Sequence, residues 1–366
     1  MSTVLLSMLV VGGIGAVLAV ALEVADRYIA NYGECTIDIN DGKREVKVDG
    51  GGSLLSALVG EGIFIPSACG GRGSCGYCRC GIDEGGGPVL PTEESWLSPD
   101  EVASNMRISC QVKVRNDMRI RIPEKLFSIS EYEGVVKRIT ELTYDIKEVL
   151  IELVDPPEID YQTGEYMQLQ TPEYGDVDES VYRAYSMSSV AADKRHVEFI
   201  IRRVPDGICT TWVHDHLKEG DEVTVNGPHG DFFLRETDAP IIMIAGGSGM
   251  APFKGMLREM AAAKNPRPVR FFFGANTERD VYHTELMQQL ESEIPDFKFI
   301  PALFKPEGDW KGETGLITEA VDRLVEADLA MWEGYLCGSP GMIDACVEVL
   351  KKHGLPEDNI YFDKFS

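Results

Sequence analysis

Four cysteines crowd into a stretch of twelve residues, and this cluster constrains the fold and function of the chain more than any other feature. Cys69, Cys75 and Cys78 have the spacing C-x5-C-x2-C in a glycine-rich segment, and Cys110 follows with 31 residues between it and Cys78. Three thiolates in a glycine-rich loop and one distant cysteine are typical of a [2Fe–2S] cluster. The glycines allow the backbone to curl around such a cluster with N–H groups directed at sulfur. We therefore predict that these four cysteines are the metal ligands.

A zinc site with four cysteine ligands is the alternative for the same residues. Zinc ribbons usually present two separate C-x2-C pairs, and the second pair is missing here. Covalent haem attachment is excluded because Arg79, not histidine, follows Cys78. Cys80 lies too close to Cys78 to share the same loop face, so we interpret it as a strand residue beside the site. The spacing favours the [2Fe–2S] cluster over zinc.

Length and charge limit the class of protein and its partners. At roughly 150 residues per domain, a chain of 366 residues is expected to form two or three domains. It carries 35 Lys and Arg against 60 Asp and Glu, a net charge of −25. Such an acidic chain is not expected to bind nucleic acid, or an anionic membrane surface, by charge alone.

The first segment of the chain is too apolar for an element of a water-soluble core. Residues 4–22 form a run of 19 residues without a charged side chain. At ~1.5 Å per helical residue this run spans the ~30 Å hydrocarbon core of a bilayer. A cleaved signal peptide is the alternative, and Ala19-Val20-Ala21 offers a cleavage site. Because no Lys or Arg precedes the apolar run, we favour a transmembrane helix.

Residues 34–128 are predicted to form a small α+β domain that carries the cysteine cluster. Apolar and polar residues alternate on both sides of Asn40-Asp41-Gly42, which predicts a β-hairpin with a tight turn. Ser53 is a typical N-cap residue for a short helix that extends to Val59.

Residues 131–235 contain short strand-like segments at regular intervals, which predicts a small antiparallel β-barrel. Its segment Arg183-Ala184-Tyr185-Ser186 combines a cation for a phosphate, a ring for stacking and a hydroxyl for hydrogen bonding. An ordinary exposed strand is the alternative for these four residues. Residues 207–211 are predicted to open a helix at 212–217, whose free N–H groups would bind a pyrophosphate. A plain threonine N-cap is the alternative there.

Residues 238–366 alternate strand and helix patterns, which predicts a parallel sheet with helices on both faces. The strand 241–245 runs into the sequence GGSGMAP at residues 246–252, and a strand, a glycine turn and a helix start together form a phosphate cradle. The sequence CGSP at residues 337–340 follows another strand, at the sheet edge where ligands bind. A buried core thiol is the alternative for Cys337.

The residues after the strand 269–273 bear on the choice of nucleotide. A 2′-phosphate needs cationic partners, and Glu278 would repel it. Asn276 stands where a cation would help, and Arg279 is the nearby cation in the sequence. If the phosphate cradle takes a nicotinamide dinucleotide, as the resemblance described next implies, these residues favour NADH over NADPH.

These motifs together resemble those of a known family. The cysteine loop is similar to that of plant-type ferredoxin domains with one extra residue between the first two cysteines, and RAYS and GGSGMAP resemble motifs of the ferredoxin–NADP reductase superfamily. The cysteine spacing and the apolar segment before it resemble the F subunit of the sodium-translocating NADH:quinone reductases. The resemblance implies a multidomain chain: a transmembrane helix (4–22), a β-grasp [2Fe–2S] ferredoxin domain (34–128), an antiparallel β-barrel FAD domain (131–235) and an α/β Rossmann-like NADH domain (238–366). One departure is the short stretch before Arg183, where that family usually carries an insertion.

The resemblance also implies roles for individual residues. Ser186 would contact flavin N5, Cys337 would lie beside the nicotinamide and Phe365 would cover the flavin ring, so these three are the predicted catalytic residues. Ser186 and Cys337 also count as cofactor-binding residues. The other residues predicted to hold FAD or the dinucleotide are Arg183, Tyr185, Gly207, Thr210, Thr211, Gly246, Gly247, Gly249, Pro252 and Gly338.

The implied function is the entry of electrons into a membrane complex. Electrons would pass from NADH through FAD and the [2Fe–2S] cluster to a membrane partner, and finally to quinone through other subunits of a multisubunit complex. Because NADH is cytoplasmic, the large domains would lie on the cytoplasmic side of a bacterial inner membrane, anchored by the single helix. A reductase component that delivers electrons from NADH to an oxygenase is the alternative. A ferredoxin-like carrier fused to an inert scaffold is the third interpretation.

Overall fold

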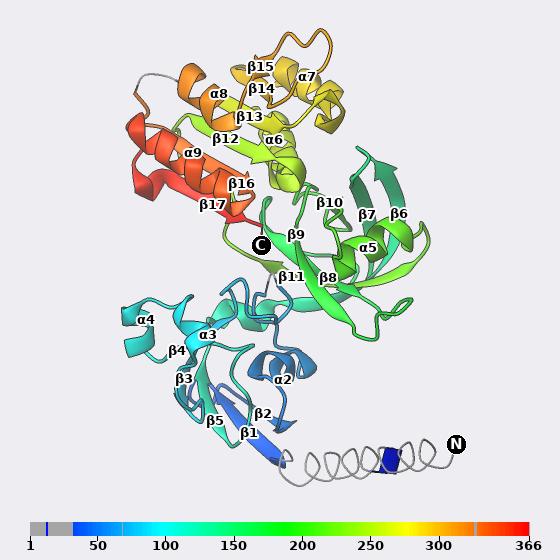
Figure 1. The fold of residues 1–366 in the computed structure, drawn as a ribbon, viewed down its shortest axis with the longest axis vertical. Coiled ribbons are helices and arrows are strands. Elements are labelled where there is room, and N and C mark those ends of the chain that lie inside the picture. Colours follow the sequence, from blue (N-terminus) through cyan, green and yellow to red (C-terminus); the bar gives the residue numbers. More distant parts are fainter. Residues whose placement is uncertain (1–11, 14–31, 68, 326–327, 366) are drawn as a thin grey trace, which may run out of the picture. The chain divides into compact units, whose positions relative to one another are not determined.

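The computed structural model describes residues 12–13, 32–67, 69–325 and 328–365, and its elements are labelled as in Figure 1. Contacts within the chain define two compact units, an N-terminal unit (residues 1–67 with 71–128) and a C-terminal unit (residues 68–70 with 129–366). The transmembrane helix predicted at 4–22 lies outside the described residues, apart from Gly12 and Gly13. In the described part of the chain, no helix has both the length and the hydrophobicity to cross a bilayer.

The N-terminal unit is a five-stranded sheet with short helices, in the strand order β2-β1-β5-β3-β4. Strands β1 and β5 pair in parallel, and the other neighbours pair antiparallel. The elements are β1 (Glu34–Ile39), β2 (Arg44–Asp49), α2 (Leu54–Gly60), β3 (Arg79–Glu84), α3 (Pro91–Glu94), α4 (Pro99–Ala103), β4 (Met106–Ile108), β5 (Met118–Arg121) and the 3-10 helix η1 (Glu124–Ser128).

The local signals in this unit are confirmed. Asn40, Asp41 and Gly42 form the hairpin turn with φ of 55°, 55° and 82°, the left-handed conformations that Asn, Asp and Gly tolerate best. Ser53 caps α2, and its hydroxyl accepts a hydrogen bond from the N–H of Ser56 at 3.1 Å.

The first half of the C-terminal unit is an antiparallel barrel, called the barrel below. Its strand order is β10-β7-β6-β11-β8-β9, and an antiparallel bridge between Met187 and Phe199 joins the two ends of the sheet. Phe199, Val149 and Val225 are among the fully buried side chains of its core. The elements are β6 (Ser130–Glu141), β7 (Ile146–Asp155), β8 (Tyr166–Thr171), β9 (Val181–Ser186), β10 (His196–Arg202), α5 (Ile208–Asp215) and β11 (Glu222–His229).

The helix predicted at 212–217 begins earlier than the sequence suggests. Helix α5 starts at Ile208 with Gly207 as its N-cap and ends at Asp215. The alternative of a plain threonine N-cap was wrong, because Gly207 is the N-cap and Thr210 lies inside the first turn. Its hydroxyl accepts a hydrogen bond from the N–H of Val204 at 3.1 Å and so ties this turn to the preceding loop.

The second half of the C-terminal unit is a parallel sheet with helices on both faces, called the nucleotide domain below (Figure 1). Alternate residues of β12 face opposite layers: Ile241 and Met243 pack with α6 and α7, whereas Ile242 and Ile244 pack with α8 and α9. The strand order is β15-β14-β13-β12-β16-β17. The elements are β12 (Ile241–Gly246), η2 (Gly247–Gly249), α6 (Met250–Ala262), β13 (Val269–Ala275), η3 (Glu278–Asp280), α7 (Thr284–Glu293), β14 (Phe297–Leu303), β15 (Glu313–Thr314), α8 (Ile317–Leu324), β16 (Glu333–Gly338), α9 (Pro340–Lys352), η4 (Glu357–Asn359) and β17 (Ile360–Lys364).

Candidate redox site

Two of the four predicted cluster ligands are brought together by strand pairing. Strands β3 and β4 pair antiparallel with Arg79 opposite Ile108, which places the preceding Cys78 beside Ser109 and Cys110. The N–H of Ser109 donates to the carbonyl of Cys78 at 2.8 Å. All nine cysteines belong to the described residues, and none of them forms a disulfide. No disulfide therefore competes with metal binding by the predicted ligands.

Glycines let the loop before Cys78 turn tightly. Gly73 and Gly76 have φ of 76° and 68°, where a side chain would be strained. Trp96 covers both positions, since its indole N–H donates to the carbonyl of Gly73 at 3.0 Å and a Cβ on Gly76 would lie 2.8 Å from its ring. This covered glycine loop fits the backbone cradle that a [2Fe–2S] cluster requires.

The Cys78 thiol resists ionisation in the protein alone. The hydrogen bond with Cys110 and burial raise the pKa of Cys78 well above the usual value of a thiol. Bound iron would supply the positive charge that favours the thiolate. Among the described residues, no group of three or more His, Cys, Asp or Glu side chains is arranged so that it could hold a metal ion.

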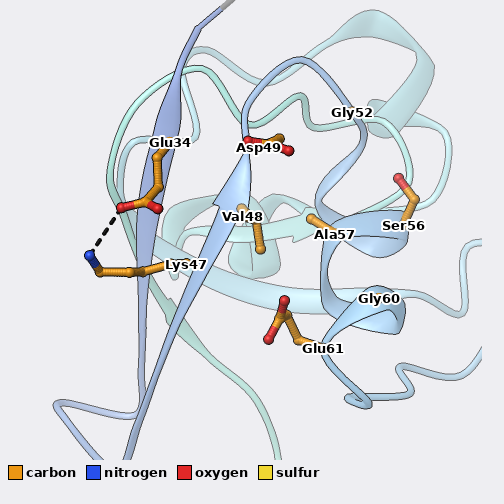
Figure 2. Close-up of a pocket in the computed structure, with 9 residues that line it drawn as sticks. All are labelled: Glu34, Lys47, Val48, Asp49, Gly52, Ser56, Ala57, Gly60 and Glu61. Carbon is orange, nitrogen blue, oxygen red and sulfur yellow. Dashed lines mark hydrogen bonds and ion pairs between the residues drawn. The ribbon is translucent and has the colours of Figure 1, made fainter.

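A surface hollow of about 480 Å³ lies in the N-terminal unit, beside β2 and α2 (Figure 2). Lys47 and Glu34 on its rim form an ion pair at 3.0 Å. No cysteine lines it, so it does not belong to the redox site. The lining residues are Glu34, Lys47, Val48, Asp49, Gly52, Ser56, Ala57, Gly60 and Glu61.

Strand β9 and helix α5 bring the predicted flavin-binding residues together. Arg183, Tyr185 and Ser186 lie among the last four residues of β9, and Gly207, Thr210 and Thr211 belong to the start of α5. Burial raises the pKa of Tyr185 well above its usual value, and the side chain of Cys209 in α5 is a hydrogen-bond neighbour of this ring. In the described structure no side chain caps α5 at Gly207, which leaves its N-terminus open to an anion.

The glycine turn before α6 packs closely against Cys337, the residue predicted to lie beside the nicotinamide. A Cβ on Gly249 would lie 2.2 Å from the carbonyl oxygen of Cys337, so this position requires glycine. Within the described part, no side chain caps α6 at Gly249. Gly246 and Gly247 complete the turn before α6, and Pro252 lies in its first turn.

The structure adds a cation that the sequence analysis missed. A Cβ on Gly247 would lie 3.3 Å from Nη1 of Arg202, which extends from β10 to the glycine turn. Asp145 holds this guanidinium at 2.7 Å. The contact of Arg202 with the glycine turn has no local sequence signal, because Arg202 and Gly247 are more than 40 positions apart.

The predicted catalytic residues converge at the ends of β9, β16 and β17. The hydroxyl of Ser186 donates to Oδ2 of Asp363 at 2.8 Å, and Asp363 is the strand partner of Cys337. The N–H of Phe365 donates to the carbonyl of Gly338 at 2.9 Å. Residues from the barrel and from the nucleotide domain therefore form one site.

Asp363 is a site residue that the sequence did not reveal. Burial raises the pKa of its carboxyl to about 6, although the hydrogen bond from Ser186 lowers it in part. Burial, followed by the charge of Asp363, raises the pKa of Cys337 well above the usual value of a thiol. A carboxyl that titrates near neutral pH next to Ser186 is able to hold or release a proton there.

The fold and this site define a class of protein: a redox chain with three modules for a [2Fe–2S] cluster, FAD and a nicotinamide nucleotide. Models of three families match the chain: the 2Fe-2S iron-sulfur cluster binding domain at residues 37–115, the oxidoreductase FAD-binding domain at 133–234 and the oxidoreductase NAD-binding domain at 243–348. The cofactors of the chain are accordingly a [2Fe–2S] cluster, FAD and NADH.

Curated relatives narrow this class. The F subunits of the Na(+)-translocating NADH-quinone reductases of Psychrobacter cryohalolentis and of Pseudomonas aeruginosa are each 36% identical over 391 residues, which covers 95% of this chain and 95% of the relative. The chain belongs to this family, the F subunits of the Na(+)-translocating NADH-quinone reductases. It is an oxidoreductase in which electrons pass from NADH through FAD to the [2Fe–2S] cluster. Since the alignments are longer than the 366 residues of the chain, the relatives carry residues that it lacks.

Solved structures superpose on most of the chain. The Amycolatopsis cytochrome P450 reductase GcoB superposes with a TM-score of 0.72 at 28% identity, covering 90% of this chain and 98% of that protein. The ferredoxin reductase in carbazole 1,9a-dioxygenase superposes with a TM-score of 0.70 at 28% identity, covering 91% and 98%.

Proposed function

We propose that the chain is the membrane-anchored electron-input subunit of an NADH:quinone oxidoreductase. The observation that carries the proposal is the convergence of Ser186, Cys337 and Asp363, which joins the predicted flavin contact to the predicted nicotinamide contact. The similarity to Na(+)-translocating NADH-quinone reductase subunits over 95% of the chain supports quinone as the final acceptor and ion translocation by the complex.

The residues of the chain would bind FAD and NADH, orient the two rings and exclude water from them. Arg183 and the open start of α5 would hold the FAD phosphates, while the glycine turn before α6 would hold those of NADH. Ser186 would hydrogen-bond flavin N5, and Phe365 would shield the ring. When bound, FAD would supply the conversion of a two-electron hydride donor into single electrons, and Cys69, Cys75, Cys78 and Cys110 would hold the one-electron [2Fe–2S] cluster.

The membrane part of the proposal rests on the sequence. Residues 4–22 would form a single-pass anchor in a bacterial inner membrane, with domains 34–128, 131–235 and 238–366 on the cytoplasmic side. The partners would be further membrane subunits that pass the electrons to quinone.

The test is expression of the full chain in its native membrane, followed by detergent extraction and purification. We expect a yellow-brown protein that contains FAD and two irons per chain, reduces ferricyanide with NADH and co-purifies with further membrane subunits. Purification of an active protein without any membrane subunit would contradict the role in a complex. Deletion of residues 1–31 tests the anchor. We expect the shortened protein to be lost from the membrane fraction.

A reductase that serves an oxygenase is the second candidate, because the two superposed structures are named as reductases of a cytochrome P450 and of a dioxygenase. The two candidates differ in the acceptor. Reduction of a ubiquinone analogue by NADH in membranes, lost when the chain is absent, would favour the quinone reductase.

The preference for NADH is proposed to depend on the turn after β13. The carboxylate of Glu278 accepts hydrogen bonds from the N–H of Glu307 at 2.9 and 3.0 Å, so its charge is fixed beside this turn. Arg279 lies over the ring of Tyr144 at 4.1 Å from the centroid. We expect Glu278→Gln to raise kcat/KM for NADPH about threefold by removing one repulsive charge, with little change for NADH. Steady-state kinetics with both nucleotides would measure this, and an unchanged ratio would contradict it.

A further inference from the structure

A buried ion-pair cluster joins the nucleotide domain to the barrel. Nζ of Lys254, in α6, lies 2.5 Å from Oε2 of Glu148 in β7 and 2.5 Å from Oε1 of Glu198 in β10. All three side chains belong to residues that are at most 5% exposed. One lysine of the nucleotide domain therefore forms ion pairs with two carboxylates of the barrel away from water.

Strand pairing explains why the two carboxylates face the same lysine. Glu148 is the antiparallel partner of Ile200, and Glu198 lies two residues from Ile200 on the same face. Arg138 of β6 lies 3.6 Å from Glu148 and 3.3 Å from Glu198, but its side chain is half exposed. Lys254 is the buried lysine of the described cluster, and it comes from the nucleotide domain.

Further contacts extend the cluster on both sides. Nε2 of His283, the N-cap of α7, lies 3.0 Å from Oε2 of Glu148. The hydroxyl of Ser188 donates to Oε1 of Glu198 at 2.8 Å. Burial by itself would raise the pKa of Glu148, but the hydrogen bond with His283 and the charge of Lys254 outweigh it and lower the pKa to about 2. Both carboxylates thus have polar partners that offset their burial.

The cluster lies close in sequence to both predicted cofactor contacts. Lys254 follows the glycine turn at Gly249 by five residues, and Ser188 follows Ser186 by two. Between them the backbones come close, since a Cβ on Gly255 would lie 2.7 Å from the carbonyl oxygen of Ser189. The close packing of Gly255 on Ser189 thus connects the first half of α6 to the segment that follows β9.

We propose that Lys254 is a positioning residue for hydride transfer, which holds the glycine cradle of α6 at a fixed distance from Ser186 by bridging Glu148 and Glu198. The inference rests on the proposed function, because it concerns the NADH-to-FAD step. Hydride transfer demands close approach, and a displacement of about 1 Å can cost roughly 100-fold in rate. Loss of Lys254 would leave two buried carboxylates without their bridging cation and loosen the junction.

The experiment compares Lys254→Met with wild type in the full, FAD-loaded chain. We expect the limiting rate of flavin reduction by NADH, measured by stopped flow, to fall at least tenfold, while the NADH concentration for half-maximal rate changes less than threefold. Hydrogen–deuterium exchange is expected to rise in residues 187–200 and 250–258 and to stay unchanged in residues 34–67. Lys254→Arg, which keeps the charge, is expected to recover at least part of the rate.

Matched variants separate positioning from a general loss of structure. Arg258→Met removes an exposed cation from the same helix and is expected to behave as wild type. Lys254→Met combined with Glu198→Gln removes one charge of each sign, so it is expected to fold if the single variant does not, and to show the same slow flavin reduction.

The outcomes distinguish this inference from the proposed function. Wild-type flavin reduction in an FAD-loaded Lys254→Met or double variant would overturn the positioning role, and so would unchanged exchange at the junction. A wild-type protein whose FAD is not reduced by NADH would overturn the proposed function instead, and the exchange measurement would then decide by itself whether Lys254 holds the junction.

Discussion

The two units of the chain build their redox sites in opposite ways. For the [2Fe–2S] cluster, three predicted ligands lie within ten residues of sequence, and a single strand pairing of the N-terminal unit brings the fourth beside Cys78. In the C-terminal unit, the bond between Ser186 and Asp363 joins residues 177 positions apart. The first site depends mainly on the conformation of one loop, whereas the second depends on how a barrel and a parallel sheet pack together.

The difference predicts different responses to substitution. A change in the cysteine loop should remove one cofactor and leave the other reaction intact. A change at the junction of barrel and sheet should leave the cofactors bound but slow the transfer between them. The following predictions test this contrast in order of decreasing effect.

The largest effect is expected for Cys78→Ser. Loss of one thiolate should abolish the [2Fe–2S] absorbance and its paramagnetic signal on reduction, while FAD content and ferricyanide reduction by NADH stay near wild type. Cys80→Ala is the matched control, because Cys80 is buried two residues away and is not a predicted ligand. A cluster retained in Cys78→Ser, or lost in Cys80→Ala, would show that the ligands are assigned wrongly.

A large effect confined to the second site is expected for Gly249→Ala. The new methyl group would meet the carbonyl of Cys337 at 2.2 Å, and a backbone atom cannot move aside cheaply. NADH-driven flavin reduction should fall about 100-fold, with the [2Fe–2S] content unchanged. Gly341→Ala is the control, since its Cβ would have no heavy atom within 4 Å. Equal effects of both variants would contradict a role for close packing.

A moderate, pH-dependent effect is expected for Asp363→Asn. The folded-state pKa of about 6 lies above the ordinary value of 3.8, so the folded protein binds this proton more tightly than the unfolded chain does. The folding stability contributed by the protonated carboxyl therefore falls as pH rises from about 4 to about 6. Above pH 6 no further change is expected from this group. Replacing it with an amide should raise the Tm at pH 7 by about 3 °C and much less at pH 4.5. Calorimetry at both values measures this, with the exposed Asp358→Asn as control; an equal gain at both values would contradict the raised pKa.

The smallest effect is expected for Ser53→Ala in the N-terminal unit. Its hydroxyl caps α2, and removal of such a cap costs about 1 kcal/mol of stability. Urea unfolding followed through the cluster absorbance should show this loss without any change in flavin reduction by NADH. A change in the flavin reaction would mean that the two units do not respond independently.

Much of the fold followed from local patterns. Alternation around Asn40-Asp41-Gly42 and the cap at Ser53 predicted the first elements, and the alternating strands and helices after residue 238 predicted the parallel sheet. Helix α5 starts at Ile208 rather than at the predicted residue 212, because residues 208–211, expected to open the helix, already form its first turn, in which Thr210 accepts a hydrogen bond from the preceding loop. The hydroxyl of an N-cap threonine accepts a hydrogen bond from an N–H of its own helix, whereas that of Thr210 accepts one from the preceding loop. The sequence alone does not specify which N–H lies near the hydroxyl.

The amino-acid sequence by itself determined the cofactor set and the order of the modules, because cysteine spacing, glycine turns and phosphate-binding helix starts act within a few residues of one another. Only the tertiary structure decided which distant groups complete the site: Asp363 beside Ser186, Arg202 beside Gly247 and Lys254 between Glu148 and Glu198. Each of these contacts joins different strands or helices, and their partners are set by strand register and helix packing rather than by neighbours in the chain.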